Sequence, residues 1–203
     1  MHETTDVETV VVRFDDLADG AAGAVGQIVG QIAKIKGCSQ VVGSCGSDEK
    51  VEYLIKECGY DAAFNYKTDT NYMAKVRELC PKGVDCYFDN VGGDLTDAVF
   101  ANLAPMARVS ICGMISQYNL EKPEMGPRTT YMMMLIRQVT VQGFLVPQFG
   151  AKFPEGIQQM AQWIDEDKIT YREDILEGLE NTPKAFIRML NGENKGKQLV
   201  KVS

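Results

Sequence analysis

The feature that most limits the fold of this chain is a regular alternation of short apolar runs with amphipathic segments. Such alternation is typical of strands and helices that take turns in a parallel sheet. With 45% hydrophobic residues in 203, the chain can bury a core of ordinary domain size. We therefore predict an α/β fold with a doubly wound, mainly parallel, six-stranded sheet. Its predicted strands are Glu8–Val12, Gln40–Ser44, Ala62–Asn65, Val84–Asp89, Arg108–Cys112 and Val139–Val146.

Helical periodicity fills the intervals between these strands. Two buried stripes are predicted, one before Gly37 and one after the N-cap Ser47. The first consists of Val25, Ile28, Val29, Ile32 and Ile35, and the second of Val51, Leu54, Ile55 and Cys58. Further helices are predicted over Asp69–Cys80, Asp94–Ala104, Thr129–Gln138 and around Phe153–Ile164. After them come a strand at Tyr171–Glu177, a helix at Thr182–Leu190 and a strand at Lys197–Val202, whose two strands need partners outside the main sheet.

A glycine-rich turn, GAAGAVG at residues 20–26, precedes the first helix. Small residues there let the backbone approach a pyrophosphate, whose charge is stabilised by the helix N-terminus. In its strand, turn and helix context the motif indicates a nucleotide-binding, Rossmann-type domain. The alternative is a purely structural turn. The segment Arg13–Asp19 separates the strand from the turn, and its three acidic residues oppose a phosphate, so it is either part of a differently placed strand or an insertion that damages the site.

The end of the second strand bears on the choice of nucleotide. NAD-binding domains usually place a carboxylate there to bind the ribose hydroxyls. This chain has instead Gly43-Ser-Cys-Gly-Ser-Asp-Glu-Lys50, with no carboxylate at the strand end and with Lys50 able to neutralise a 2′-phosphate. The sequence favours NADP over NAD, unless Lys50 is only a solvated helix residue.

Polar residues also follow the fourth and fifth predicted strands. Asn90 comes directly after one, and the segment Cys112–Asn119 follows the other. The carboxyl ends of neighbouring parallel strands line the ligand crevice of such sheets. Asn90 and Tyr118 are therefore candidate site residues, or else ordinary turn residues.

Composition excludes several classes of function. The net charge of −7 makes the chain a poor binder of nucleic-acid phosphates. Neither a membrane span nor a secretory signal is visible. The six cysteines form no CxxC pair and have no histidine partner except His2, so we expect no metal site and a reducing, cytoplasmic location.

Several longer motifs resemble one known family. They are GAAGAVG, GSDEKVEYL, AAFNYKT, DCYFDNVGG, CGMISQYN, FLV and GENKGKQLVKV, in this order. The chain is similar, from about Val7 to Ser203, to the prostaglandin reductase and leukotriene 12-hydroxydehydrogenase group of the zinc-independent medium-chain dehydrogenases and reductases. The resemblance implies an NADP(H) cofactor and no metal.

The resemblance also implies a set of cofactor-binding residues. The pyrophosphate would lie on the glycine turn, at Gly23, Ala24, Val25 and Gly26. Lys50 and Tyr66 would hold the 2′-phosphate end, Asn90 the middle of the cofactor, and Asn194 would close over it. The nicotinamide half would be lined by Cys112, Gly113, Met114, Ile115, Ser116, Gln117, Tyr118, Phe144, Leu145 and Val146.

The activity implied is the NADPH-dependent reduction of the carbon–carbon double bond of an α,β-unsaturated ketone, such as a 15-oxo-prostaglandin. Hydride transfer to the β-carbon leaves negative charge on the ketone oxygen, and a hydroxyl donor stabilises it. Tyr118 is the candidate catalytic donor. Two alternatives remain: a quinone reductase of the same superfamily, and a catalytically dead nucleotide-binding or interaction protein.

Family members run to roughly 330 residues and begin with a barrel-like domain that forms one wall of the substrate cleft. We expect residues 7–168 to form the NADP(H)-binding domain and residues 169–203 to be a segment that packs on that absent domain. The sixth strand, Val139–Val146, is a candidate for pairing with its copy in a homodimer.

Overall fold

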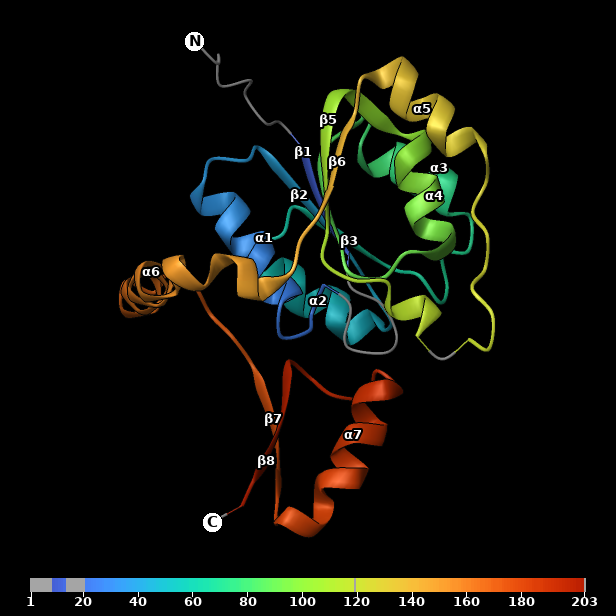
Figure 1. Cartoon of the computed structure of the whole chain (residues 1–203). Helices are drawn as coiled ribbons and strands as arrows, with labels where there is room; N and C mark the ends of the chain where they lie inside the picture. The colour runs from blue at the N-terminus through green and yellow to red at the C-terminus, as the bar shows by residue number, and fades with distance from the viewer. Residues whose placement is uncertain (1–8, 14–20, 119, 203) are drawn as a thin grey trace.

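The computed structural model describes residues 9–13, 21–118 and 120–202. Within them, one parallel sheet contains six strands in the order β3-β2-β1-β4-β5-β6 (Figure 1). This is the strand order of the Rossmann fold, so the predicted fold class is confirmed. The strands are β1 (Thr9–Arg13), β2 (Gln40–Cys45), β3 (Ala62–Asn65), β4 (Val84–Asp89), β5 (Leu103–Ile111) and β6 (Thr140–Gly143).

Helices cover both faces of the sheet (Figure 1). One face carries α1 (Gly26–Ile35) and α2 (Asp48–Lys56), and the other carries α3 (Tyr72–Leu79), α4 (Gly93–Ala101) and α5 (Thr129–Arg137). Each face has its own buried apolar cluster. Leu54 and Tyr60 belong to the cluster under α1 and α2, and Tyr87 and Val99 to the one under α3 and α4.

Tyr60 determines how closely α1 approaches the sheet. Its side chain is 2% exposed, and its hydroxyl donates a hydrogen bond of 2.7 Å to the carbonyl of Gly26. A Cβ atom at Gly30 would lie 2.1 Å from Cζ of Tyr60, and one at Gly43 would lie 2.8 Å from Cε1. The glycines of α1 and β2 thus make room for this ring.

The buried face of α1 therefore differs from the predicted one. Its buried residues are Gly26, Gln27, Gly30 and Gln31, whereas Val25 is 46% exposed. In α2, Ile55 is 43% exposed and the buried positions are Lys50, Tyr53 and Leu54. Both predicted stripes were wrong in part, because specific hydrogen bonds and glycine packing replaced apolar burial.

In the main sheet, two strand boundaries differ from the prediction by more than one residue. β5 begins at Leu103 and not at Arg108, because α4 ends already at Ala101. β6 ends at Gly143 and not at Val146, because a 3₁₀ helix with a proline in its first turn, η2 (Val146–Lys152), follows it.

The C-terminal part forms a small separate sheet below the main one (Figure 1). After α6 (Phe153–Asp165), β7 (Glu173–Glu177) and β8 (Lys197–Lys201) pair with each other in parallel. η3 (Leu179–Asn181) and α7 (Thr182–Leu190) form their crossover. The two strands that needed partners thus supply them to one another.

Two buried glutamines of α1 attach this C-terminal part to the main domain. Gln31 exchanges hydrogen bonds with the backbone of Thr170, at 2.7 Å to the carbonyl and 2.8 Å from the N–H. Gln27 accepts from the N–H of Arg172 at 2.9 Å and from the hydroxyl of Tyr53 at 2.6 Å. No helix in the described part of the chain is long and apolar enough to cross a bilayer.

Replacement of Gly30 by alanine should destabilise the protein. Its Cβ would overlap the Tyr60 ring, which is enclosed on all sides, and overpacking of a core costs about 1–3 kcal/mol. The free energy of unfolding in urea should fall by that amount. Gly156→Ala in the first turn of α6 is the matched control, because nothing lies within 4 Å of its Cβ position, and it should leave stability equal or higher. Equal stability of the two variants would contradict this account of Tyr60.

Candidate functional site

The loop after β4 is shaped by Asp89, a residue that sequence reasoning did not select. Its buried carboxylate accepts hydrogen bonds from the N–H groups of Val91 and Gly92, at 2.9 and 3.1 Å. It also accepts one from the Thr96 hydroxyl, at 2.9 Å. These bonds fix the turn that carries Asn90. The available sequence signal was the position of an aspartate at the end of a predicted strand.

The loop after β5 is bound to the loop after β4 through its backbone. The N–H of Ile115 donates to the carbonyl of Asn90, and the N–H and hydroxyl of Ser116 both donate to the carbonyl of Val91. Gln117 accepts from the N–H of Glu124 at 2.8 Å. Ile115, Ser116 and Gln117 thus position the loop, and their side chains do not line the neighbouring hollow.

That hollow has a volume of about 490 Å³. Several predicted residues line it, namely Cys112, Gly113, Met114, Tyr118, Phe144 and Leu145, together with Ile111, Gly143 and Gln148. Phe144 is held between Phe88 and Phe149, with ring centroids at 6.0 and 5.9 Å. Val146, also predicted for this half, is not among the lining residues.

Gly113, which lines the hollow, lies close to polar atoms of both Asn90 and Tyr118. A Cβ there would lie 2.5 Å from Oδ1 of Asn90 and 3.0 Å from the hydroxyl oxygen of Tyr118. Tyr118 is 66% exposed, and its oxygen accepts a hydrogen bond of 3.3 Å from the N–H of Met114. Because the oxygen acts as an acceptor here, its proton is available to a ligand.

The N-terminus of α1 lies at the same edge of the sheet. Its first turn has no acidic residue, and its N-cap residue, Val25, makes no side-chain capping bond to the described residues. The N–H of Gln27 bonds to the carbonyl of Gly23, and the N–H of Ala21 bonds to the carbonyl of Ser44 at the end of β2. Of the segment Arg13–Asp19, which separates the predicted first strand from the glycine turn, Arg13 is the last residue of β1, and residues 14–20 lie outside the described residues. An uncapped helix N-terminus is suited to an anion.

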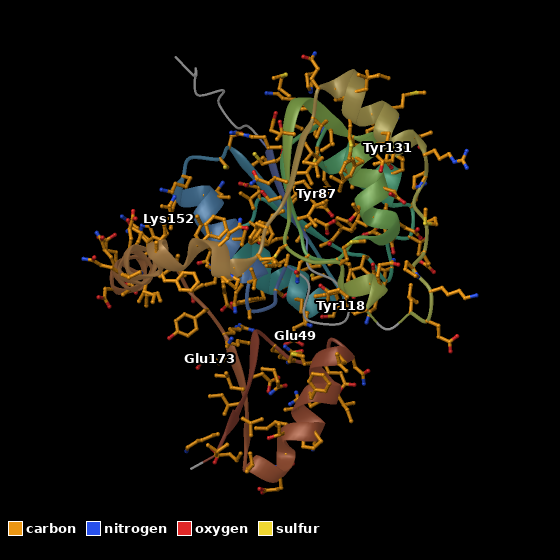
Figure 2. All side chains as sticks on the ribbon, in the orientation of Figure 1. Glu49, Tyr87, Tyr118, Tyr131, Lys152 and Glu173 are labelled. Carbon is orange, nitrogen blue, oxygen red and sulfur yellow. The ribbon has the colours of Figure 1, made fainter. Side chains whose placement is uncertain are left out.

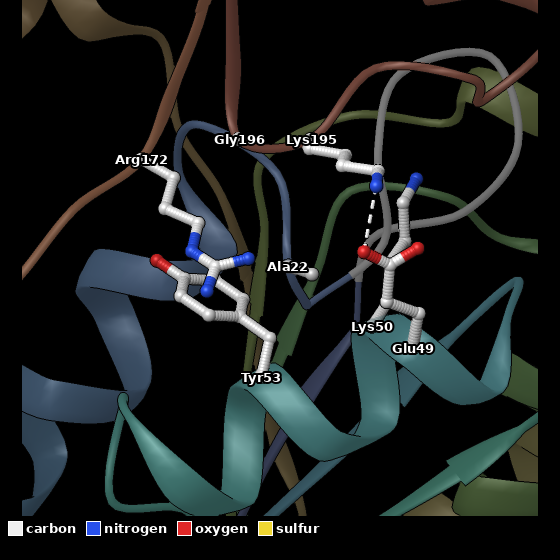
Figure 3. A pocket seen from close by; sticks show the side chains of 7 residues that line it. All are labelled: Ala22, Glu49, Lys50, Tyr53, Arg172, Lys195 and Gly196. Carbon is white, nitrogen blue, oxygen red and sulfur yellow. Dashed lines mark hydrogen bonds and ion pairs between the residues drawn. The ribbon is translucent and has the colours of Figure 1, made fainter.

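A group of cations lies between α2 and the C-terminal part (Figure 3). Lys50 is buried and donates to the carbonyl of Gly192 at 2.8 Å. Lys195 forms an ion pair of 2.6 Å with Glu49, and the Arg172 guanidinium lies 4.2 Å from the centroid of the Tyr53 ring. Glu49, Lys50, Tyr53, Arg172 and Lys195 line a pocket of about 10 Å³, together with Ala22 and Gly196, which is room for about one water molecule.

The predicted residues Tyr66 and Asn194 are both buried. A Cβ at Gly46, in the loop before α2, would lie 2.5 Å from the hydroxyl of Tyr66, and Lys67 lies over the Tyr66 ring at 5.9 Å. Asn194 is 2% exposed and donates to the carbonyl of Gly196 at 2.8 Å. Its Oδ1 is buried without a hydrogen-bond partner among the described residues. A buried acceptor of this kind requires a donor, which a ligand can supply.

Arg172 and Lys195 were not predicted. They are more than 100 residues from their partners Glu57 and Glu49, so no local pattern could have identified them. The hollow beside Tyr118 and the cations beside Glu49 lie at the same end of the sheet. Tyr118 and Glu49 are both at its carboxyl edge, whereas Tyr131 is at the opposite end (Figure 2).

Within the described part of the chain, no cluster of three or more His, Cys, Asp or Glu side chains could hold a metal ion.

Comparison with known proteins agrees with this geometry. The sequence pattern of the family described as "Zinc-binding dehydrogenase" matches residues 24–166. The chain is 50% identical to the putative NADP-dependent oxidoreductase YfmJ of Bacillus subtilis over 198 residues, which is 97% of this chain and 56% of that protein. It is 45% identical to prostaglandin reductase 1 of Bos taurus over 91% of this chain and 56% of that protein. The chain thus spans about half the length of these curated relatives.

Among solved structures, CurA of Vibrio vulnificus in complex with NADPH has a TM-score of 0.87 at 38% identity, over 98% of this chain and 58% of that one. The quinone oxidoreductase of Escherichia coli complexed with NADPH has a TM-score of 0.76 at 18% identity, over 97% of this chain and 57% of that one, which shows the common fold. The recognition of the family from its motifs is therefore confirmed.

Removal of the Asp89 carboxylate should destabilise the loop that carries Asn90. Asp89→Ala leaves the N–H groups of Val91 and Gly92 buried without an acceptor, at a cost of about 1–3 kcal/mol each. Asp89→Asn retains an acceptor oxygen, so its urea denaturation midpoint should lie much closer to that of the wild type. Asp94→Ala, an exposed acid in the first turn of α4, is the control and should have a small effect. If alanine and asparagine at position 89 prove equally stable, the assigned role of the carboxylate is wrong.

Proposed function

Because this chain belongs to the zinc-binding dehydrogenase family, within the medium-chain dehydrogenases and reductases, we propose that it binds NADP(H) along the carboxyl edge of its parallel sheet. The observation that carries the proposal is the alignment of three features along that edge. They are the uncapped N-terminus of α1, the cations around Lys50, and the hollow beside Asn90 and Tyr118. Ligands of open α/β sheets bind at this edge, where the strand order reverses.

The chain's own groups suit the parts of this cofactor. The N-terminus of α1, at Gly23–Gly26, offers backbone N–H groups to the pyrophosphate. Lys50 supplies charge for a 2′-phosphate. Oδ1 of Asn194, which has no hydrogen-bond partner among the described residues, supplies an acceptor for a ribose hydroxyl or an amide. Since the pocket at Lys50 has room for about one water molecule, we expect Lys195 to leave Glu49 when the phosphate binds.

We propose further that the chain supplies the cofactor-binding part and the hydrogen-bond donor for the reduction of an enone. The cofactor, when bound, supplies a hydride. Tyr118 donates its hydrogen bond to the carbonyl oxygen of the α,β-unsaturated ketone, where negative charge develops as the β-carbon is reduced. Phe144, Leu145 and Met114 provide an apolar wall of the hollow for the substrate's hydrocarbon part. A 15-oxo-prostaglandin is the preferred substrate, by similarity to prostaglandin reductase 1.

A quinone is the second candidate substrate, supported by the shared fold of quinone oxidoreductases. The relatives' additional length leaves room for a substrate-binding domain outside residues 7–168. We propose that residues 169–203 contact it through exposed apolar side chains such as Ile175 and Phe186. The six cysteines are free thiols, which suits the proposed cytoplasmic location.

We also propose a homodimer through β6, which is an edge strand of the main sheet. The adjacent helix α5 exposes four large apolar side chains, Tyr131, Met132, Leu135 and Ile136. Exposed apolar residues gathered on one helix are typical of an interaction surface, whereas scattered ones are not. Sedimentation should give twice the monomer mass, and a Leu135→Glu variant should be monomeric. A monomeric wild type would reject the dimer.

Calorimetric titration of the chain with NADPH and NADH tests the cofactor. Tighter binding of NADPH is expected, because only it carries the 2′-phosphate. Lys50→Met should weaken NADPH binding about ten- to a hundredfold, the range for a charge-assisted hydrogen bond, and leave NADH binding nearly unchanged. Lys56→Met, on the exposed face of the same helix, should bind NADPH as the wild type does. No binding of either nucleotide would reject the proposed cofactor site.

Replacement of Tyr118 by phenylalanine tests the catalytic donor. Turnover of an enone should fall about a hundredfold or more, with NADPH affinity within a few fold of the wild type. Tyr131→Phe, an exposed tyrosine at the other end of the sheet, is the control. Unchanged turnover in Tyr118→Phe would remove the residue from the mechanism. NADPH binding without hydride transfer to an enone or a quinone would favour a catalytically dead nucleotide-binding protein.

A further inference from the structure

A second polar pocket lies at the opposite edge of the sheet, where β4 and β5 begin. It has a volume of about 230 Å³ and is lined by Arg77, Lys82, Asn102, Ala104, Pro105 and Arg137, among others. Gly83, in its wall, precedes β4, whereas Asn90 follows that strand. The full length of β4 and β5 thus separates this pocket from the proposed cofactor site.

An irregularity in β5 shapes this pocket. Leu103 pairs with Val84, and Arg108 pairs with Cys86, so β5 advances five residues while β4 advances two. The extra residues bend β5 at Pro105 and at Met106, whose φ of +63° lies in the left-handed region. Ala104 and Pro105 of this bulge form part of the wall.

The lining of this pocket is cationic. Arg77 comes from α3, Arg137 from the last turn of α5, and Lys82 from the loop before β4. None of the described residues that line it is acidic. Cys80 adds no negative charge at neutral pH, because burial and then the Asp85 carboxylate raise the pKa of its thiol to about 12.

Neither arginine of this pocket has a protein partner in the described residues. No hydrogen bond or ion pair joins Arg77 or Arg137 to another described group, and Nε of Arg137 is buried without an acceptor. A buried, unpaired N–H of a charged group is costly. If the arginines served only to neutralise the carbonyl ends of their own helices, α3 and α5, they would be expected to bond to those carbonyls. They form no such bonds.

We propose that this pocket binds a phosphate group, held by the guanidinium groups of Arg77 and Arg137. Planar guanidinium groups recognise phosphate oxygens with paired, charge-assisted hydrogen bonds. A tetrahedral anion can accept from two arginines on different helices at once. The phosphate belongs either to free inorganic phosphate or to a phosphorylated metabolite. This site is independent of the proposed cofactor site, because its residues lie at the other edge of the sheet.

Calorimetric titration of the full chain with inorganic phosphate, in a phosphate-free buffer at low salt, tests the site. The measurement is made with and without saturating NADPH. Arg77→Gln and Arg137→Gln should each weaken phosphate binding about tenfold or more, with and without NADPH. Arg128→Gln, which removes the same charge from an exposed position at the start of α5, should bind phosphate as the wild type does. Pyrophosphate and a sugar phosphate, titrated in parallel, distinguish the free anion from a phosphorylated metabolite.

Thermal unfolding without phosphate verifies that each variant is folded, and Arg77→Gln changes an exposed side chain, so it should remain folded. The proposal is overturned if the wild type does not bind phosphate. It is also overturned if both arginine variants bind phosphate like Arg128→Gln, or if NADPH abolishes phosphate binding to the wild type. The last result would place the anion in the cofactor site. Failure of NADPH to bind would instead reject the proposed function and leave this test intact.

Discussion

The position of the Tyr60 ring is the constraint on which the rest of the structure depends. The ring fills the space between α1 and β2, and it fits because Gly30 and Gly43 have no side chains. Burial raises the pKa of its phenol well above the ordinary value, so the hydroxyl stays protonated and continues to donate to the carbonyl of Gly26. Through this contact α1 is held close to the sheet, and its uncapped N-terminus is directed to the carboxyl edge. Gly30 and Gly43, which lie outside the glycine-rich turn, therefore have a structural role.

The same close approach buries the two glutamines that hold the C-terminal part. Gln27 and Gln31 share the buried face of α1 with Gly26 and Gly30, and their amides satisfy backbone groups at Thr170 and Arg172. Arg172 then lies over the Tyr53 ring and forms an ion pair with Glu57 of the α2 C-cap. The exposed ion pairs contribute little to stability by themselves. The buried amide hydrogen bonds fix the register of this segment, and so bring Asn194 and Lys195 to Lys50.

The alternation of strands and helices in the sequence was sufficient to predict a doubly wound parallel sheet, because strands joined by helical crossovers pair in parallel. β3, β4 and α7 have the predicted bounds. The prediction failed where tertiary contacts override periodicity. The buried face of α1 is made of glycine and glutamine, since its partners are a tyrosine ring and a backbone segment about 140 residues away. The early start of β5 was missed because its first residues belong to a bulge at Pro105 and Met106.

The site residues also divide into those that the local sequence indicates and those that depend on tertiary contacts. Asn90 and Tyr118 were predicted because each follows a strand, and the topology of the sheet brings strand ends together, whereas Gly113 was predicted from the family resemblance. Asp89 was missed, although its three hydrogen bonds give the Asn90 loop its shape. Arg172 and Lys195 depend on how the C-terminal segment docks, which no local spacing encodes.

The distribution of cations at the two edges of the sheet reconciles the two proposed anion sites with a net charge of −7. At physiological ionic strength charges are screened beyond about 8 Å, so the local groups decide, and the net charge acts mainly on the rate of encounter. At the carboxyl edge the helix N-terminus and Lys50 provide positive potential together. At the amino edge the helices present their carbonyl ends, which oppose an anion, so a site there needs fixed cations. Arg77 and Arg137 are such cations, and the bulge of β5 provides the space in front of them.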